Sequence, residues 1–438
     1  MVKVERAIGA CDKSVAHILE NALLGKEVSV SEGERLLQTQ GPELAATIAA
    51  ANHLRRRRNG DRVTYVVNRN INFTNVCVKR CGFCAFSRGH RAEQGYFLPM
   101  EEVVRRAREA WDLGATEVCV QAGLPPRMQG SLYIDLCRAI KSEVPDIYIH
   151  GFSPEEVLYG AERSRCSVAE YLAGLKEAGV GSLPGTSAEI LDDEIRDRIS
   201  PGRITTAAWI DVITTAHRLG IATTSTIMYG HIETPRHCAA HIGLLRDIQR
   251  ETGGFTEFVP LSFIHSEAPM YQKSLVPGVR AGATDEEVLR MYAVSRIMLD
   301  GFIHHIQASW VKQGVPMAQA CLDAGADDLG GTLMNESIST AAGAPHGHFL
   351  SPSKMRAAIR AAGRIPAERA TTYRLRQVFE CEPNYPEPLD IIEAEASFGS
   401  YHTLIASPEF RFKKAIPNEK AATTQSSEVA AVCAAKES

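Results

Sequence analysis

Eight short runs of apolar and β-branched residues alternate with longer helical patterns from residue 63 onward, and this rhythm allows few folds. The runs cover residues 63–73, 117–121, 147–152, 180–183, 223–229, 257–263, 304–309 and 329–334. Capping boxes mark helix starts between them, for example Ser167 with Glu170 and Thr284 with Glu287. The alternation predicts an α/β protein, a (β/α)8 TIM-type barrel, with a doubly wound open sheet as the alternative.

Two flanking segments differ from this central region. Residues 1–60 carry apolar residues at helical spacing and few turn signals, which predicts an N-terminal helical extension before a barrel over residues 61–375. In residues 376–438 the pattern weakens, and Lys, Thr, Ser and Ala dominate from Asn418 onward. We expect this C-terminal extension to end in a disordered tail of about 20 residues.

The charge balance and the absence of long apolar runs restrict the possible partners. The 438 residues include 48 basic and 52 acidic side chains, a net charge of −4 at pH 7, so no general attraction draws the chain to nucleic acid or to anionic membranes. No stretch has the length and apolarity of a membrane span, and no signal peptide is recognisable. We therefore expect a cytoplasmic protein that binds small molecules and neither nucleic acid nor membrane.

Three of the eleven cysteines form a cluster directly after the first predicted strand. Cys77, Cys81 and Cys84 have the spacing CxxxCxxC, and the other eight cysteines are isolated. Thiolates prefer soft metals, and a loop this short can place three of them on three corners of an iron–sulfur cube. The fourth iron would then be open to chelate S-adenosylmethionine (SAM) and release a 5′-deoxyadenosyl radical from it. The motif predicts a 4Fe–4S cluster and SAM as cofactors.

A structural zinc site is the competing hypothesis for the same cysteines. His90 would complete a Cys3His tetrahedron, and the barrel would then be a zinc-stabilised binding scaffold rather than an enzyme. Zinc sites of this kind usually pair two CxxC units, and no second CxxC occurs in the sequence. The spacing favours the iron–sulfur cluster.

Segments at the predicted strand ends extend this interpretation to a family. The CxxxCxxC motif with Phe83 before its last cysteine resembles the signature of the radical SAM superfamily. The wider sequence resembles FO synthase subunit 2, the tyrosine 4-hydroxyphenyl transferases of deazaflavin biosynthesis. This second resemblance covers roughly residues 60–375 and is carried by residues 67–75, 121–126, 152–156, 182–186, 228–234 and 334–339.

Close relatives share the cysteine loop and the barrel. They are FO synthase subunit 1 and the two radical enzymes of the futalosine route to menaquinone, which are the alternative assignment. The segments after the second, fifth and eighth predicted strands favour subunit 2.

The resemblance implies a reaction and its partners. The 4-hydroxybenzyl group of L-tyrosine would pass to 5-amino-6-(D-ribitylamino)uracil, with release of 2-iminoacetate, methionine and 5′-deoxyadenosine. FO synthase subunit 1 would be the functional partner. A reductant such as ferredoxin or flavodoxin would supply electrons.

The resemblance also suggests residues for the cofactors. Cys77, Cys81 and Cys84 would ligate the cluster, and Phe83 would pack near the adenine. Backbone groups of Gln121, Ala122 and Gly123 would face the methionine amino group of SAM, because glycine permits close backbone approach. Ala122 stands where relatives often have glycine, and its methyl group should crowd that contact slightly. Glu189 would hold a ribose hydroxyl, or it caps the following helix.

Candidate catalytic residues follow the fifth predicted strand. That strand ends in Tyr229-Gly230-His231-Ile232-Glu233, which places His231 and Glu233 on one face at period two. Such a pair suits binding of the ribityl or uracil group and proton transfer, and a salt bridge of Glu233 with Arg236 is the alternative. Weaker candidates for the same wall are His265, Gln307, Ser309, Asn335 and Glu336.

Overall fold

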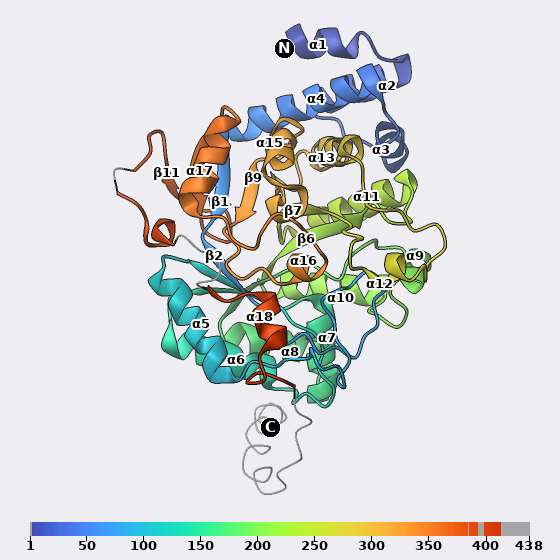
Figure 1. Cartoon of the computed structure of the whole chain (residues 1–438). Coiled ribbons are helices and arrows are strands. Elements are labelled where there is room, and N and C mark those ends of the chain that lie inside the picture. Colours follow the sequence, from blue (N-terminus) through green and yellow to red (C-terminus); the bar gives the residue numbers. More distant parts are fainter. Residues whose placement is uncertain (1, 384, 393–397, 413–438) are drawn as a thin grey trace, which may run out of the picture.

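Parallel strands form the centre of the molecule, and helices surround them in the computed structural model (Figure 1). The structure describes residues 2–383, 385–392 and 398–412. The predicted disordered tail lies outside these residues.

Seven parallel strands form one sheet, in the order β2-β3-β4-β5-β6-β7-β8. Their bounds are β2 (Asn68–Ile71), β3 (Glu117–Val120), β4 (Tyr148–Gly151), β5 (Val180–Leu183), β6 (Ala222–Tyr229), β7 (Phe255–Ser262) and β8 (His305–Ile306). A second sheet has the order β11-β10-β1-β9. It contains β1 (Arg62–Val66), β9 (Asp328–Gly331), β10 (Ile365–Arg369) and β11 (Leu375–Val378).

The two sheets join into one ring of strands. A parallel bridge between Gln307 and Asp328 links β8 to β9, and β9 pairs with β1, which leads through Val67 into β2. A second bridge, between Arg69 and Met334, links β2 to the segment after β9. The predicted α/β barrel is confirmed.

Two strand predictions need correction. The run over residues 63–73 is not one strand, because the chain changes partners at Val67: β1 pairs with β9 and β10, whereas β2 pairs with β3. The strands β10 and β11 were not predicted. Pro366 and the charged pair Glu368 and Arg369 give β10 a weak strand pattern, since proline and charged residues are uncommon inside strands.

Helices connect successive strands. The predicted capping boxes are confirmed at Ser167 with Glu170 and at Thr284 with Glu287. The helices are α5 (Met100–Asp112), α6 (Leu132–Glu143), α7 (Pro154–Ser164), α8 (Val168–Glu177), α9 (Asp193–Ile199), α10 (Thr206–Arg218), α11 (Pro235–Thr252), α12 (Pro269–Gln272), α13 (Asp285–Leu299), α14 (Trp310–Gln313), α15 (Val315–Asp323), α16 (Ile338–Ala341) and α17 (Pro352–Ala361).

The N-terminal and C-terminal segments both pack on the barrel. The first segment forms α1 (Val2–Ile8), α2 (Lys13–Leu23), α3 (Val30–Leu36) and α4 (Gly41–Asn59), and α4 packs against α13 and α15 (Figure 1). The C-terminal segment forms the 3-10 helix η1 (Pro388–Ile391) and α18 (Tyr401–Ala406). Within the described residues, no helix is both long and apolar enough to cross a membrane.

Asp327, just before β9, joins four elements near the N-terminal ends of the strands. Its Oδ1 accepts hydrogen bonds from the Arg296 guanidinium at 2.7 Å and from the Ile306 amide at 2.8 Å. Its Oδ2 accepts from His305 Nδ1 at 2.6 Å and from the Asn59 amide at 2.8 Å. Burial alone would raise the pKa of Asp327, but Arg296 and His305 hold it below its usual value. This carboxylate therefore ties α4, α13 and β8 to β9.

Tyr373, in the turn between β10 and β11, closes the same end of the barrel. Its ring stacks on His305 with 3.7 Å between ring centroids, and its hydroxyl donates to Glu257. Arg369 lies 4.1 Å from the centroid of the Tyr373 ring and forms a two-pronged ion pair with Asp328. Burial raises the pKa of Glu257 to about 7, although Arg369 opposes the shift.

Replacing Asp327 by Asn should destabilise the fold, because the buried Arg296 would lose its counter-charge. We expect the free energy of unfolding to fall by about 3–5 kcal/mol, measured by chemical denaturation. The matched control is Asp112→Asn, since Asp112 is 61% exposed and lies 3.7 Å from Arg108. That change should cost less than about 0.5 kcal/mol. Equal losses in the two variants would contradict the role of Asp327.

Glu257 should make stability depend on pH in a defined direction. Its pKa of about 7 in the folded state lies above the ordinary value of 4.5, so folding favours the protonated form. Its contribution is complete below pH 4.5 and is lost as the pH rises through about 7. Relative to Glu257→Gln, wild-type unfolding free energy should fall by about 1–3 kcal/mol between pH 5 and pH 8. A constant difference between the two proteins would refute this.

Candidate functional site

A cavity lies at the C-terminal ends of the strands, where parallel barrels carry their ligand sites. Among the described residues, the predicted site residues that line it are Cys77, Cys81, Phe83, Cys84, Gln121, Ala122, Gly123, Glu189, Gln307, Ser309 and Glu336. The predicted candidates that do not line it are His231, Glu233, His265 and Asn335.

Backbone hydrogen bonds to other elements hold the cysteine loop. The Cys77 amide donates to the Arg88 carbonyl at 3.0 Å, and the Gly82 amide donates to the carbonyl of Ile199, the last residue of α9, at 2.8 Å. The Gly82 carbonyl accepts from Met270 in α12 at 2.7 Å. Burial raises the pKa of the Cys77 thiol, and that of Cys81 to about 12. Thiols in such a site ionise as they bind metal.

The thiols do not have the arrangement of a zinc site. Within the described part of the chain, no three His, Cys, Asp or Glu side chains converge closely enough to share one metal ion. An iron–sulfur cube binds each thiolate to a different iron, so its ligands stand farther apart than those of one zinc ion. His90, the proposed fourth zinc ligand, is exposed and does not line the cavity. His90 is therefore not placed to complete the Cys3His set.

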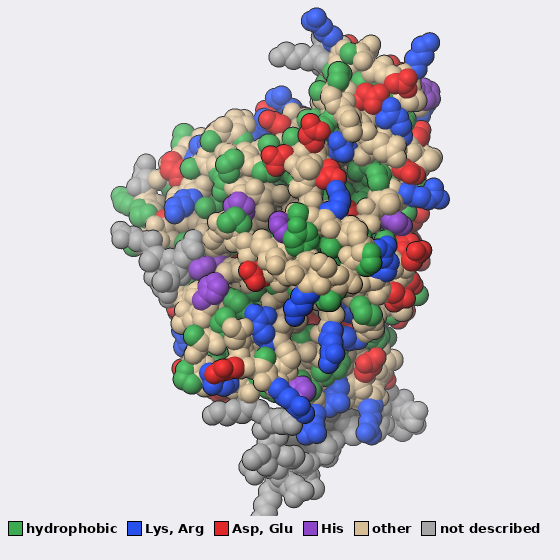
Figure 2. All heavy atoms as spheres, turned by 45° about the vertical axis from the view of Figure 1, so that its right-hand side comes forward, with side chains coloured by type: hydrophobic (Ala, Val, Ile, Leu, Met, Phe, Trp, Pro, Cys, Tyr) green, Lys and Arg blue, Asp and Glu red, His purple; other side chains and the backbone are tan. Residues whose placement is uncertain are grey.

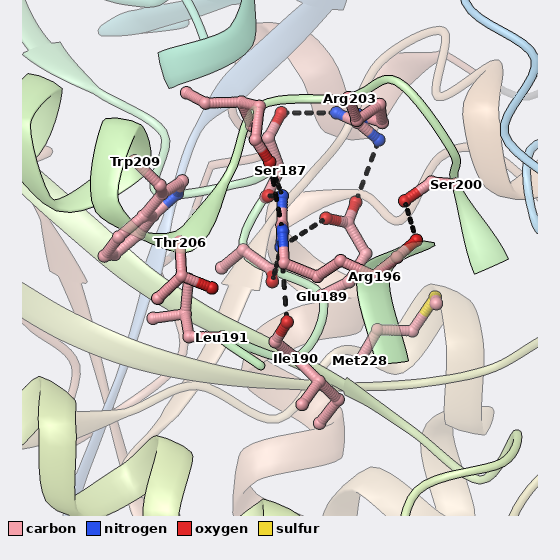
Figure 3. A network of polar contacts seen from close by, with 12 residues as sticks. Ser187, Glu189, Ile190, Leu191, Arg196, Ser200, Arg203, Thr206, Trp209 and Met228 are labelled. Carbon is pink, nitrogen blue, oxygen red and sulfur yellow. Dashed lines mark hydrogen bonds and ion pairs between the residues drawn. The ribbon is translucent and has the colours of Figure 1, made fainter. Parts of the chain in front are cut away.

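Arg203 connects the cysteine loop to the segments after β4 and β5, and Figure 3 shows its contacts with Ser187 and Glu189. Its guanidinium donates to Glu155 at 3.2 Å, to Glu189 at 3.1 Å and to the Ser187 hydroxyl at 2.5 Å. The same group lies 3.6 Å from the Cys81 sulfur. Burial would raise the pKa of Glu155, but Arg203 and Lys79 lower it below the usual value. A cation shared by two carboxylates therefore stands directly beside the thiols.

Two neighbours complete this wall of the cavity. The Lys79 ammonium lies 3.0 Å from Glu155, so both cations near the thiols have a carboxylate partner. The Phe83 ring lies 5.6 Å from the Arg203 guanidinium carbon. Phe83 therefore lines the cavity next to the Arg203 guanidinium, a position from which its ring could also contact a ligand.

Glu189 has one oxygen without a hydrogen-bond partner. Its Oε1 accepts from Arg203, whereas its Oε2 is buried, lies 3.7 Å from Arg196 and accepts no hydrogen bond among the described residues. Glu189 and Ser187 both have positive φ, at 40° and 64°, and Arg196 holds their loop by donating to its carbonyls. The capping alternative is wrong, because Asp192 caps α9. A hydroxyl donor would complete this carboxylate.

The segment after β3 uses its amides within the protein. The Ala122 amide donates to Glu156 at 2.9 Å, and the Gly123 amide donates to the Thr74 carbonyl at 2.8 Å. A Cβ atom on Gly123 would stand 2.4 Å from the Val76 carbonyl oxygen, so only glycine fits there. Burial raises the pKa of Glu156 to about 7. A ligand amino group needs hydrogen-bond acceptors, so the carbonyl oxygens of this segment, rather than its amides, would serve it.

The predicted geometry of His231 and Glu233 is wrong. β6 ends at Tyr229, and Gly230, with φ of 90°, turns the chain, so the period-two face does not exist. Glu233 folds back and accepts from the amides of Gly230 at 2.6 Å and His231 at 2.8 Å. Its carboxylate also lies 3.2 Å from Arg280 and 3.3 Å from His231 Nδ1, so the two predicted residues are in contact through the turn rather than along a strand.

The buried ring of His231 bonds the Met228 carbonyl at 3.0 Å, and burial lowers its pKa. The suggested salt-bridge partner of Glu233 was also wrong, because Arg236 instead lies 3.7 Å from Glu34. The catalytic assignment of His231 and Glu233 receives no support from this geometry.

The remaining candidates divide between the cavity and the frame around it. Gln307, Ser309 and Glu336 line the cavity. Asn335 instead donates to the carbonyls of Phe398 and Gly399 at 2.7 and 2.8 Å, which anchors the C-terminal segment. His265 packs against Tyr271, with 4.7 Å between ring centroids.

The sequence analysis did not identify several residues that line the cavity. They include Lys312 in α14, Glu155, Glu156 and Arg203. Glu155 and Glu156 stand in a segment quoted for the family resemblance, which could have identified them. Arg203 and Lys312 belong to no motif. Only the folded structure brings them to the cavity.

Comparisons with known proteins agree with this site. The sequence pattern of the radical SAM superfamily matches residues 71–245, and that of the CofH/MqnC C-terminal region matches residues 252–381. The 5-amino-6-(D-ribitylamino)uracil–L-tyrosine 4-hydroxyphenyl transferase of Methanothermobacter thermautotrophicus is 49% identical, over 82% of this chain and 96% of its own length. The Methanocaldococcus jannaschii enzyme of the same name is 48% identical, over 81% and 99%.

Longer proteins and solved structures extend the comparison. The FO synthase of Mycobacterium leprae is 49% identical over 78% of this chain, but the match spans only 39% of that longer protein. The [FeFe]-hydrogenase maturase HydG matches 84% of this chain and 79% of its own with a TM-score of 0.65 and 17% identity. Methylornithine synthase (PylB) matches 80% and 97% with a TM-score of 0.60 and 16% identity. These two structures support the fold alone.

The cysteine motif fits the superfamily, and the identity extends over almost the whole length of two relatives with the same name. The chain belongs to the 5-amino-6-(D-ribitylamino)uracil–L-tyrosine 4-hydroxyphenyl transferase family of radical SAM enzymes.

Proposed function

We propose that this protein transfers the 4-hydroxybenzyl group of L-tyrosine to 5-amino-6-(D-ribitylamino)uracil. One observation carries the proposal: three thiols and the incompletely bonded carboxylate of Glu189 line one cavity, in a chain 49% identical to a named transferase. The identity supports the substrates, and the cavity supports the radical chemistry.

The residues present fit the two cofactors of this superfamily. Cys77, Cys81 and Cys84 would ligate three irons of a 4Fe–4S cluster, and the fourth iron would remain for SAM. The Glu189 carboxylate, one oxygen of which accepts no hydrogen bond, suits a ribose hydroxyl, and Phe83 is an aromatic residue of the same cavity. Carbonyl oxygens of residues 121–123 would accept from the amino group of SAM. When bound, the cluster and SAM supply an adenosyl carbon radical that can remove a hydrogen atom from tyrosine.

The reaction balances with SAM as the electron acceptor. The Cα–Cβ bond of tyrosine breaks, a bond forms between Cβ and carbon 5 of the uracil, and 2-iminoacetate leaves. Bond formation and the two imines that result release two electrons and two protons. Conversion of SAM to methionine and 5′-deoxyadenosine takes up both electrons and one proton, and the other proton is released.

The protein itself positions groups and limits access of water. Arg203 and Arg196 fix Glu189, and the hydrogen bonds of the cysteine loop fix the thiols. Apolar side chains also line the cavity, and they should protect radicals from side reactions. They are Leu124, Leu261, Phe263, Ile264, Val311, Leu333 and Ile338.

The proposal includes protein partners and a location. Basic residues flank the cysteine motif, and Arg80 and Arg91 among them are exposed. Figure 2 shows Lys and Arg side chains gathered toward the lower end of the face drawn there. A basic surface near the cluster suits an acidic electron carrier such as ferredoxin or flavodoxin. FO synthase subunit 1 would act on the product, and we place the reaction in the cytoplasm, where thiols stay reduced.

Each motif cysteine should be required for the cluster. After anaerobic reconstitution the wild type should hold about four irons per chain and show the visible absorption of an iron–sulfur centre. Changing Cys84 to Ala should lower the bound iron and reduce 5′-deoxyadenosine formation to background. Cys321→Ala is the control, because Cys321 is buried in α15 away from the cavity and should leave iron unchanged. Stoichiometric zinc without iron in the wild type would refute the cluster.

The two substrates should be consumed together. Anaerobic incubation of reduced enzyme with SAM, tyrosine and the ribitylaminouracil should yield the coupled product by mass spectrometry, and omission of either substrate should abolish it. Fluorescent FO should form only after FO synthase subunit 1 is added, since one cysteine triad implies one radical site. Turnover of a futalosine-type substrate with tyrosine ignored, or FO formation by this chain alone, would contradict the proposal.

A further inference from the structure

Lys312 lies in the cavity wall on the side away from Arg203. It belongs to α14, directly after β8, whereas Glu155 and Glu189 follow β4 and β5. In the ring of eight strands from β2 to β9, β8 is four positions from β4 and therefore opposite to it. The cavity thus has cations on two opposite sides.

The position of Lys312 is well fixed. The indole of Trp310 donates to the carbonyl of Gly331 in β9 at 2.9 Å, and Gln313 donates to the Ser262 hydroxyl at 3.0 Å. These two bonds tie α14 to β9 and to the end of β7. The half-buried Lys312 side chain between them lines the cavity rather than extending into solvent.

Lys312 differs from the other cations of the cavity in having no direct partner. Among the residues that the structure describes, no carboxylate forms an ion pair with its ammonium group. The charge of Glu336 acts on the pKa of Lys312, but the Glu336 oxygens accept hydrogen bonds from the amides of Ser339 at 2.8 Å and Ile338 at 3.1 Å. Lys79 and Arg203, in contrast, have Glu155 as a partner. Burial lowers the pKa of Lys312, which an anionic ligand would reverse.

A cation placed in this way costs folding free energy unless a ligand uses it. The half-buried Lys312 gives up part of its hydration without gaining an ion pair, which is unfavourable, and a methionine of similar length would avoid that cost. Proteins keep such groups mainly where function requires them. The ligand must carry an anionic group, and tyrosine and SAM each carry an α-carboxylate.

We propose that Lys312 binds the α-carboxylate of L-tyrosine. The inference rests on the proposed function. SAM must reach the cysteine loop and Glu189, where Arg203 already stands, so the carboxylate left for the opposite wall is that of tyrosine. The neighbouring apolar residues Val311, Leu333 and Phe263 would contact the phenol ring. Lys312 would thereby orient the Cα–Cβ bond that breaks.

Binding measurements on the reconstituted enzyme without reductant test this, because no turnover occurs. By titration calorimetry in the presence of SAM, Lys312→Met should bind tyrosine about 10- to 100-fold more weakly than the wild type. Tyramine, which lacks the carboxylate, should bind both proteins equally, and Lys312→Arg should retain most of the tyrosine affinity. The dissociation constant of SAM and the iron content should not change.

A control and a stability measurement separate binding from folding. Lys354→Met, an exposed lysine on α17, should leave every affinity unchanged. The melting temperature of Lys312→Met should equal or exceed that of the wild type. Equal tyrosine affinity in Lys312→Met and wild type would overturn the inference, and so would a loss confined to SAM. Failure of the wild type to bind tyrosine would overturn the proposed function as well.

Discussion

The cysteine loop has no regular secondary structure at its thiols, so its shape depends on hydrogen bonds to other parts of the barrel. Its amides at Val78 and Gly82 donate to Leu124 and Ile199, and its carbonyl at Gly82 accepts from Met270. These partners follow β3, end α9 and belong to α12. Three connections between strands must therefore be in place before the thiols can converge. The site depends on closure of the barrel.

Closure of the barrel depends in turn on charged groups at the opposite end. Asp327 and Asp328 each bind a buried arginine, Arg296 and Arg369, and Tyr373 covers the pair from the turn after β10. A buried ion pair contributes little net stability, but removal of one member leaves an uncompensated charge. The pairs therefore select one register among β8, β9 and β10. Stability and chemistry occupy opposite ends of the strands, as in other barrels of this type.

The sequence was sufficient for seven of the eight strand runs, the helix caps and the cysteine motif, because each depends on neighbours close in the chain. Capping boxes such as Ser167 with Glu170 span four residues, and the thiols span eight residues from Cys77 to Cys84. Arg203 and Lys312 could not be found in this way. Each lies at the cavity only because strands distant in the sequence place its segment there. No pattern of nearby residues predicts that position.

His231 and Glu233 show why polar residues at strand ends are ambiguous in a sequence. A loop that leaves a strand has amides without partners, and carboxylates such as Glu233 and Glu336 satisfy them. A carboxylate used in this way has fewer lone pairs left for a ligand. Glu189 keeps an oxygen that accepts no hydrogen bond from the described protein, and no carboxylate among the described residues forms an ion pair with Lys312, which lines the cavity. A ligand can bond to these groups without breaking hydrogen bonds within the protein. We therefore expect residues of this kind on the part of the cavity wall that contacts the ligand.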